Sequence, residues 1–290
     1  MGSGSSPTTR TTSSKLKDLS LVIVDTLNHD LASHAIRETV KRTGITDVVV
    51  FSDKKLYDNA RHIQVPPMTG IEDYSHFMLK GLVPYINTDH FLVIQYDGYV
   101  ANENEWTDEF LEYDYIGAPW SGMWGKEFDV GNGGFSLRSK KLINALQDDD
   151  IQFDLNMQYG THEDVIICVI YRKMLEEKYG IKFGTRQLAE KFSIEIGYKN
   201  PPPFGFHSSW QIPLVFDRAA LMHYIDKLDV KSMTSTSQLG LFASLAGSDD
   251  FIPATNLYQR YKEAGPFALD RLKKHLAMDP KALAFFNNNA

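Results

Sequence analysis

The 290-residue sequence is poor in cysteine, in clustered basic residues and in long apolar runs. Its one cysteine, Cys168, excludes an intrachain disulfide, and its place in the apolar stretch 165–170 predicts a buried, inert thiol. A single buried thiol fits a reducing compartment, so we expect a cytoplasmic location. No Lys/Arg run exceeds two residues and the formal net charge is -7, which argues against nucleic acid as the principal partner.

The chain also lacks the features of membrane insertion and of secretion. No stretch approaches the roughly 18 to 20 apolar residues of a transmembrane span, and the opening residues lack the charged and apolar regions of a secretory signal. Residues 1–16 resemble a cloning remnant followed by a disordered leader. The whole chain contains 43% hydrophobic residues, so the residues after this leader can bury a sizeable core. We expect one large domain at 17–213 and a helical extension at 214–290, in a chain that can be a module of a larger enzyme.

Apolar runs alternate with helical patterns in the first hundred residues. The stretches 19–25, 47–53 and 90–97 predict strands, and 30–43, 71–85 and 161–178 carry helical spacing, with Gly44 as a C-cap. Strands this apolar are typical of a parallel sheet covered by helices on both faces.

Polar residues end these predicted strands. They are Asp25, Ser52, Asp53 and Asp97. Each can simply form a loop at a strand exit, but ligands of such sheets bind at the carboxyl ends of the strands, so together these residues outline a binding rim.

Two residues are candidate ligands of a hard divalent cation, Mn²⁺ or Mg²⁺. Asp97 follows a buried strand and precedes Gly98, and His207 lies in a constrained aromatic loop after three prolines. Such ions prefer oxygen ligands and often use only one or two protein carboxylates. An ordinary Asp-Gly turn and an ordinary loop histidine are the alternatives.

The acidic pair Glu163 and Asp164 opens an apolar helical pattern. Thr161 and Asp164 satisfy the capping-box spacing, so one acid can be structural. The second acid then remains free to act as a general base on a hydroxyl group.

Three glycines lie in the segment Val130-Gly-Asn-Gly-Gly-Phe-Ser-Leu-Arg-Ser139. Because glycine has no side chain, they can bring the backbone close to a ligand, or they can simply form a bulge or turn. Arg138 can bind a phosphate bidentately or pair with an acid. The aromatic stretch 113–120, which ends in Trp120, can stack on sugar rings or fill a core.

These motifs together resemble a bacterial and viral glycosyltransferase-like family catalogued as the domain of unknown function DUF5672. The resemblance rests on 93–98, 113–120, 131–139, Glu163-Asp164 and 204–207 in that order, and covers roughly residues 18–210. The family resembles GT-A-fold nucleotide-sugar transferases. It implies an α/β fold with a mixed, mainly parallel, Rossmann-like sheet flanked by helices, ahead of the C-terminal helical extension.

The resemblance also implies roles for particular residues. Gln95 occupies the position of the first acid of the Asp-X-Asp metal motif, and Asp97 and His207 are implied to hold the metal. Glu163 or Asp164 is implied to be the base of an inverting displacement. Residues implied to hold the nucleotide are Asp25, Thr26, Ser52, Asp53, Gln95 and Asp97, and those implied to contact the sugars are Trp120, Asn132, Gly133, Gly134 and Arg138.

The expected activity is transfer of a sugar from a UDP- or dTDP-linked donor to a hydroxyl group of a glycan or saccharide acceptor, as in polysaccharide biosynthesis. A catalytically silent glycan- or nucleotide-binding module is the alternative, because Gln95 replaces an acid of the metal motif. A phosphoesterase would need two metals and hence more ligands near Asp97.

Overall fold

The computed structural model describes residues 14–248 and 250–289. Within these residues, six strands form one sheet in the order β3-β2-β1-β4-β6-β5. The strands are β1 Ser20–Val24, β2 Asp47–Ser52, β3 Arg61–Gln64, β4 His90–Ile94, β5 Tyr115–Gly117 and β6 Ser136–Ser139. β1 pairs in parallel with β2 and β4, and β2 with β3, while β6 runs antiparallel to both β4 and β5. The expected mixed, mainly parallel sheet is therefore confirmed.

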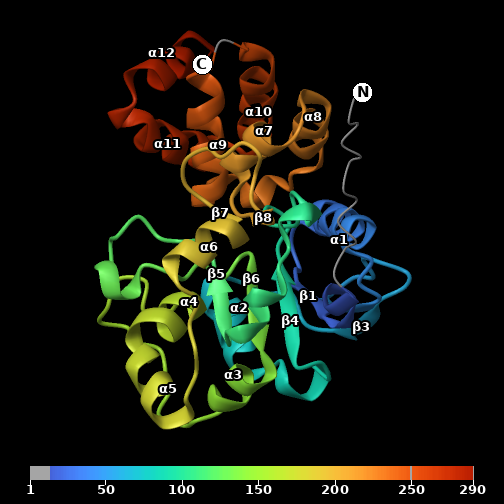
Figure 1. The fold of residues 1–290 in the computed structure, drawn as a ribbon. Helices are drawn as coiled ribbons and strands as arrows, with labels where there is room; N and C mark the ends of the chain where they lie inside the picture. The colour runs from blue at the N-terminus through green and yellow to red at the C-terminus, as the bar shows by residue number, and fades with distance from the viewer. Residues whose placement is uncertain (1–13, 249, 290) are drawn as a thin grey trace, which may run out of the picture.

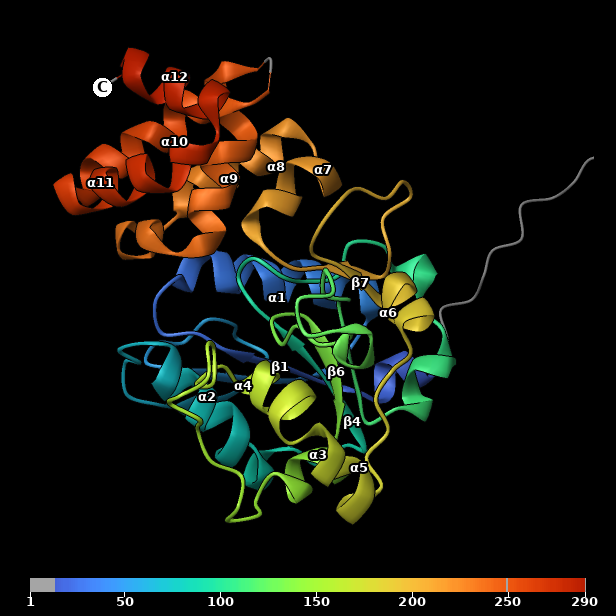
Figure 2. The same ribbon diagram turned by 90° about the vertical axis from the view of Figure 1, so that its left-hand side faces the viewer.

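Helices cover both faces of this sheet. The α-helices are α1 His29–Thr43, α2 Ile71–Lys80, α3 Lys140–Ala145, α4 Glu163–Val165, α5 Arg172–Tyr179 and α6 Arg186–Phe192. Alternate residues of β1 enter different cores: Leu21 and Ile23 pack with α1, whereas Val22 and Val24 pack with α2. Because side chains alternate along a strand, burial on both faces explains the continuous apolar run. Figure 2 shows the central strands between α1 and α2.

The remaining α-helices gather at one end of the molecule. They are α7 Ile212–Val215, α8 Arg218–Lys227, α9 Thr236–Ala246, α10 Phe251–Ala264, α11 Pro266–His275 and α12 Pro280–Asn289. Figure 1 shows them, in orange and red, beside the sheet-containing part. Their apolar residues belong to the same core cluster as β1 and α1, so the predicted C-terminal extension is helical and packs onto the sheet-containing part.

Several local predictions are confirmed and others need correction. Gly44 caps α1 with φ of 70°, the left-handed conformation that favours glycine. The predicted helix 161–178 is interrupted, because a π-helical segment Ile166–Ile170 separates α4 from α5. The capping box at Thr161 is wrong: His162 is the N-cap residue of α4 and its side chain makes no capping hydrogen bond.

The predicted leader falls mostly outside the described residues, which begin at Ser14. Ser14–Asp18 forms a 3-10 helix, and Leu16 is fully buried in the main core. The folded part therefore begins before the boundary predicted at residue 17. Among the described residues, no helix combines the length and apolar character that crossing a bilayer requires.

Candidate functional site

Asp97 is a buried carboxylate with one oxygen that accepts no hydrogen bond from the described residues. It follows β4 and is 3% exposed. The Ser237 hydroxyl, from α9, donates to Asp97 Oδ2 over 2.6 Å, whereas Asp97 Oδ1 has no hydrogen-bond partner among the described residues. A buried charge that is only half satisfied is costly, so this atom is positioned for a ligand.

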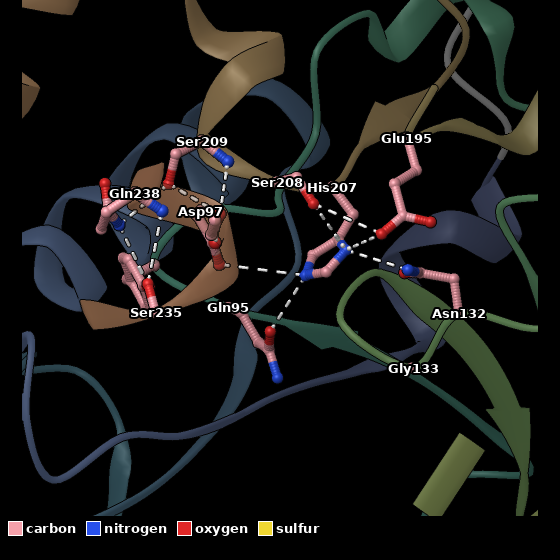
Figure 3. A network of polar contacts seen from close by, with 12 residues as sticks. Gln95, Asp97, Asn132, Gly133, Glu195, His207, Ser208, Ser209, Ser235 and Gln238 are labelled. Carbon is pink, nitrogen blue, oxygen red and sulfur yellow. Dashed lines mark hydrogen bonds and ion pairs between the residues drawn. The ribbon is translucent and has the colours of Figure 1, made fainter. Parts of the chain in front are cut away.

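His207 lies next to Asp97 and faces several acceptors (Figure 3). Its Nε2 is 3.2 Å from Gln95 Oε1 and 3.9 Å from Asp97 Oδ1, and its Nδ1 is 3.3 Å from Glu195 Oε1. Burial lowers the pKa of His207, but the hydrogen bond that its ring donates to Glu195 and the charges of the nearby carboxylates outweigh burial and raise the pKa to about 9. In the metal-free protein the ring is therefore a cation between acceptors, and a metal bound at Nε2 would have to displace the Nε2 proton.

The orientation of Gln95 is fixed by Tyr74, in α2. The Gln95 amide nitrogen donates to the Tyr74 hydroxyl over 2.7 Å, which turns the amide oxygen toward His207. Gln95 thereby contributes an oxygen where an acid was expected from the metal motif.

The three atoms Asp97 Oδ1, Gln95 Oε1 and His207 Nε2 fit a divalent cation of the Mn²⁺ or Mg²⁺ type. Two are oxygens, and Glu195 at Nδ1 matches the outer carboxylate that commonly orients a metal-ligating histidine. The described residues contain no group of three or more His, Cys, Asp and Glu side chains arranged to hold a metal. Any cation held here would rely on one carboxylate, one imidazole and one amide, and would need further ligands from substrate or water.

The glycine-rich segment owes its composition to the chain's own side chains. A Cβ on Gly134 would lie 2.1 Å from His207 Nε2, and one on Gly133 would lie 2.1 Å from Glu163 Oε1. Asn132 adopts a left-handed φ of 53°, and its amide lies 3.0 Å from His207 Nδ1. A ligand was expected to approach these glycines closely. In the structure the groups that do so are the His207 imidazole and the Glu163 carboxylate.

The acidic pair is divided between two environments. Glu163 is buried and pairs with Arg138, which is itself 0% exposed. Asp164 Oδ2 accepts the Gly133 N–H over 3.0 Å, and burial together with the charge of Glu163 raises the pKa of Asp164 to about 7. Glu163 therefore neutralises Arg138, while Asp164 has the poised pKa that suits a general base.

A cavity of about 530 Å³ lies at the carboxyl edge of β1 and β4. The residues that line it are Val24, Asp25, Thr26, Leu27, Asn28, Met68, Thr69, Gly70, Ile71, Tyr74, Gln95, Tyr96, Lys231, Ser232, Thr234, Ser235 and Arg271. Asp25, Thr26 and Gln95 were expected in a nucleotide site and line this cavity. Ser52, Asp53 and Asp97 do not line it, and Asp53 instead pairs with His29 over 2.6 Å.

A second cavity of about 400 Å³ lies on the other side of His207. Trp120, Glu195 and Tyr198 contribute to its wall. Trp120 is 7% exposed because its ring packs where a Cβ of Gly131 would be, whereas Tyr198 is 62% exposed. Gln95 lines the first cavity and Glu195 the second, so His207 contacts one residue from each.

Fold and site together define an α/β protein with a ligand cavity and a candidate cation cluster at the carboxyl edge of its sheet. The chain belongs to the family described as protein of unknown function (DUF5672), whose model matches residues 59–207, just over half of the chain. β1, α1, β2 and the C-terminal helices lie outside the matched range. No curated protein matches the sequence.

Some solved structures share a distant likeness with the chain. One is a glycosyltransferase involved in glycosylation of the major capsid of PBCV-1, with 11% identity, a TM-score of 0.41, and coverage of 66% of this chain and 94% of that one. Two are of LgtC: an active-site variant, and the galactosyltransferase with donor and acceptor sugar analogues. Each has 13% identity, a TM-score of 0.44 and coverage of 72% and 95%. At these TM-scores no conclusion about chemistry rests on the likeness.

Asp25 provides a test of the environment inside the larger cavity. Burial raises the pKa of Asp25 to about 6 from its model-peptide value of 3.8, against the N–H groups of Leu27 and Asn28, which lower it. A raised carboxyl pKa means that stability is fully present below pH 3.8 and is lost as pH rises through 6. Asp25→Asn removes this penalty while keeping an acceptor for the two N–H groups.

We therefore expect Asp25→Asn to stabilise the protein by up to about 3 kcal/mol at pH 8 and by only about 1 kcal/mol at pH 4.5. Urea unfolding of both proteins at the two pH values measures this difference. An equal effect at both pH values would show that the Asp25 carboxyl is not desolvated.

Proposed function

We propose that this protein is a metal-assisted glycosyltransferase that takes a nucleotide-sugar donor. The observation that supports this best is the convergence of Asp97 Oδ1, which accepts no hydrogen bond from the described residues, with Gln95 Oε1 and His207 Nε2. These atoms lie beside a cavity of about 530 Å³ at the carboxyl edge of the sheet. Leaving-group diphosphate must be neutralised during glycosyl transfer, and a bound Mn²⁺ or Mg²⁺ supplies that charge. A UDP- or dTDP-linked donor is the class that we propose.

In this proposal the two cavities have separate roles. The nucleotide lies in the larger one against Asp25 and Thr26, and the acceptor saccharide enters the smaller one beside Tyr198. Tyr198 is exposed and presents a flat ring of the kind that stacks on sugars. Glu195 positions His207 by accepting from Nδ1, so that Nε2 faces Gln95 and Asp97.

Asp164 is the proposed base. It accepts the proton of the acceptor hydroxyl group as that oxygen attacks the anomeric carbon and the bond to the diphosphate breaks, which inverts the configuration. A carboxylate with a pKa near 7 remains ionised in much of the protein at neutral pH and takes up the proton readily. Glu163 holds Arg138 in place instead.

Nucleotide binding tests the proposal. Isothermal titration of UDP, dTDP and GDP with and without Mn²⁺ is expected to show Mn²⁺-dependent binding of one nucleotide. Asp97→Asn should weaken that binding at least about tenfold, or about 1.4 kcal/mol, because it removes the only carboxylate of the cluster. Ser237 can still donate to the new amide oxygen, so the fold should persist.

Asp150→Asn is the matched control, since it removes the same charge from an exposed loop. Thermal melts establish that all variants are folded. Absence of binding for every nucleotide, with and without metal, contradicts the proposal. Tight binding without release of free nucleotide from any donor sugar would favour the silent binding module, which Gln95 in place of an acid supports.

Substitution of the two acids separates their roles. We expect Asp164→Asn to lower kcat by about 10² to 10⁴ with little change in nucleotide affinity, because it removes a proton acceptor. The variant should be at least as stable as the wild type above pH 7, because it removes a buried charge. Glu163→Gln should instead lower stability by about 3 kcal/mol, since it leaves the buried Arg138 without a charged partner. Rates of nucleotide release and urea unfolding measure both effects. A large loss of kcat in a stable Glu163→Gln protein, with Asp164→Asn active, would reverse the assignment.

A further inference from the structure

The larger cavity is lined in part by C-terminal residues that lie outside the family match. Lys231, Ser232, Thr234 and Ser235 come from the 3-10 helix Val230–Thr234 and the start of α9, and Arg271 comes from α11. They line the same cavity as Asp25, Thr26 and Gln95, although they are more than 130 residues away in the sequence.

Direct contacts anchor this wall to the sheet side. Ser237 donates to Asp97, and Gln238 Nε2 lies 3.3 Å from the hydroxyl oxygen of Tyr96. Figure 3 shows Gln238 of α9 and Ser235, the N-cap residue of α9, on one side of Asp97 and His207 on the other. The C-terminal helices are therefore fixed relative to the cation cluster.

The charges in the cavity wall differ from those of the protein as a whole. The chain has a formal net charge of -7, yet Lys231 and Arg271 are basic and Asp25 is the one acid among the described lining residues. Both basic side chains are exposed, and neither forms an ion pair with another described residue. The raised pKa of Asp25 further reduces negative charge in this cavity near pH 6.

Arg138, which was expected to bind a phosphate, is not available for this role. It is fully buried, and its guanidinium pairs with Glu163 and donates to the Gly133 carbonyl oxygen over 3.3 Å. A phosphate ligand in the cavity would instead meet the two cations of the C-terminal wall.

We propose that Lys231 and Arg271 bind the diphosphate of a nucleoside diphosphate, so that the C-terminal helices form half of the donor site. This assignment rests on the proposed function and adds the residues that select a diphosphate over a nucleoside or a monophosphate. Arg271 suits bidentate contact with phosphate oxygens, and Lys231 acts as a point charge. Ser232, Thr234 and Ser235 add hydroxyl groups along the same wall.

The test compares UDP, UMP, uridine and inorganic pyrophosphate by isothermal titration, in the presence of Mn²⁺ and in low salt. If UDP does not bind, UDP, UMP and uridine are replaced by dTDP or GDP with the corresponding monophosphate and nucleoside. The proteins are the wild type, Lys231→Gln, Arg271→Gln and the double variant. Lys273→Gln is the matched control, because Lys273 is an exposed cation on α11 that does not line the cavity.

We expect each single substitution to weaken diphosphate binding about tenfold and the double variant about a hundredfold, because charge-assisted phosphate contacts are lost. Nucleoside binding and the thermal midpoint should not change, and Lys273→Gln should behave like the wild type. Arg271→Lys should recover only part of the loss, since lysine lacks the planar fork.

The outcomes separate this inference from the proposed function. If the wild type binds a nucleoside diphosphate and the double variant binds it equally well, the inference is wrong and the proposed function remains. A second outcome is that the wild type binds pyrophosphate but no nucleotide, and that the double variant no longer binds pyrophosphate. The anion site at Lys231 and Arg271 is then confirmed and the nucleotide-sugar proposal fails. Binding of neither class overturns both.

Discussion

The structure around the candidate site depends on one buried carboxylate, that of Asp97. One of its oxygens accepts a hydrogen bond from Ser237, and the other accepts none from the described residues and lies 3.9 Å from His207 Nε2. A buried oxygen without a hydrogen bond is unfavourable in the free protein, and such a cost persists only where the surroundings hold it in place. The sheet presents Asp97 at the end of β4, and α9 anchors it from the opposite side, so both halves of the chain fix its position.

Glycines, which have no side chain, allow the other groups of the site to pack close to Asp97. Gly98 and Gly134 leave room for the His207 ring, and Gly133 leaves room for Glu163. Glu163 is then held by the fully buried Arg138. Because the imidazole and the carboxylate fill space that a Cβ would occupy, even an alanine at Gly133 or Gly134 would require one of these groups to move. The glycines therefore determine the geometry of the site whether or not they touch a ligand.

The part of the fold that is predictable from sequence is the part with local signals. β1, β2 and β4 are continuous apolar runs, and α1 has helical spacing with a glycine cap, so each is specified within about fifteen residues. β5 has three residues and β3 an exposed, polar pattern, which leaves no periodicity to detect. The π-helical interruption between α4 and α5 is invisible in a sequence that keeps its apolar spacing.

The candidate site follows the same division. Asp97, His207 and the acidic pair are noticeable because polar residues stand beside apolar runs and glycines. The ion pair between Arg138 and Glu163 cannot be recognised in the sequence, because each residue could equally pair with one of many surface charges. Glu195 has only a weak signal, an acid after a short strand. Lys231, Ser237 and Arg271 have none, because tertiary packing alone brings residues from the C-terminal helices to the end of β4.

Anomalous diffraction from crystals of the protein with Mn²⁺ and a bound nucleoside diphosphate would locate both the cation and the nucleotide. We expect a manganese peak within about 2.5 Å of both Asp97 Oδ1 and His207 Nε2, with the nucleotide in the cavity lined by Asp25 and Gln95. A nucleotide bound elsewhere, or a manganese ion that does not contact Asp97, would contradict this expectation.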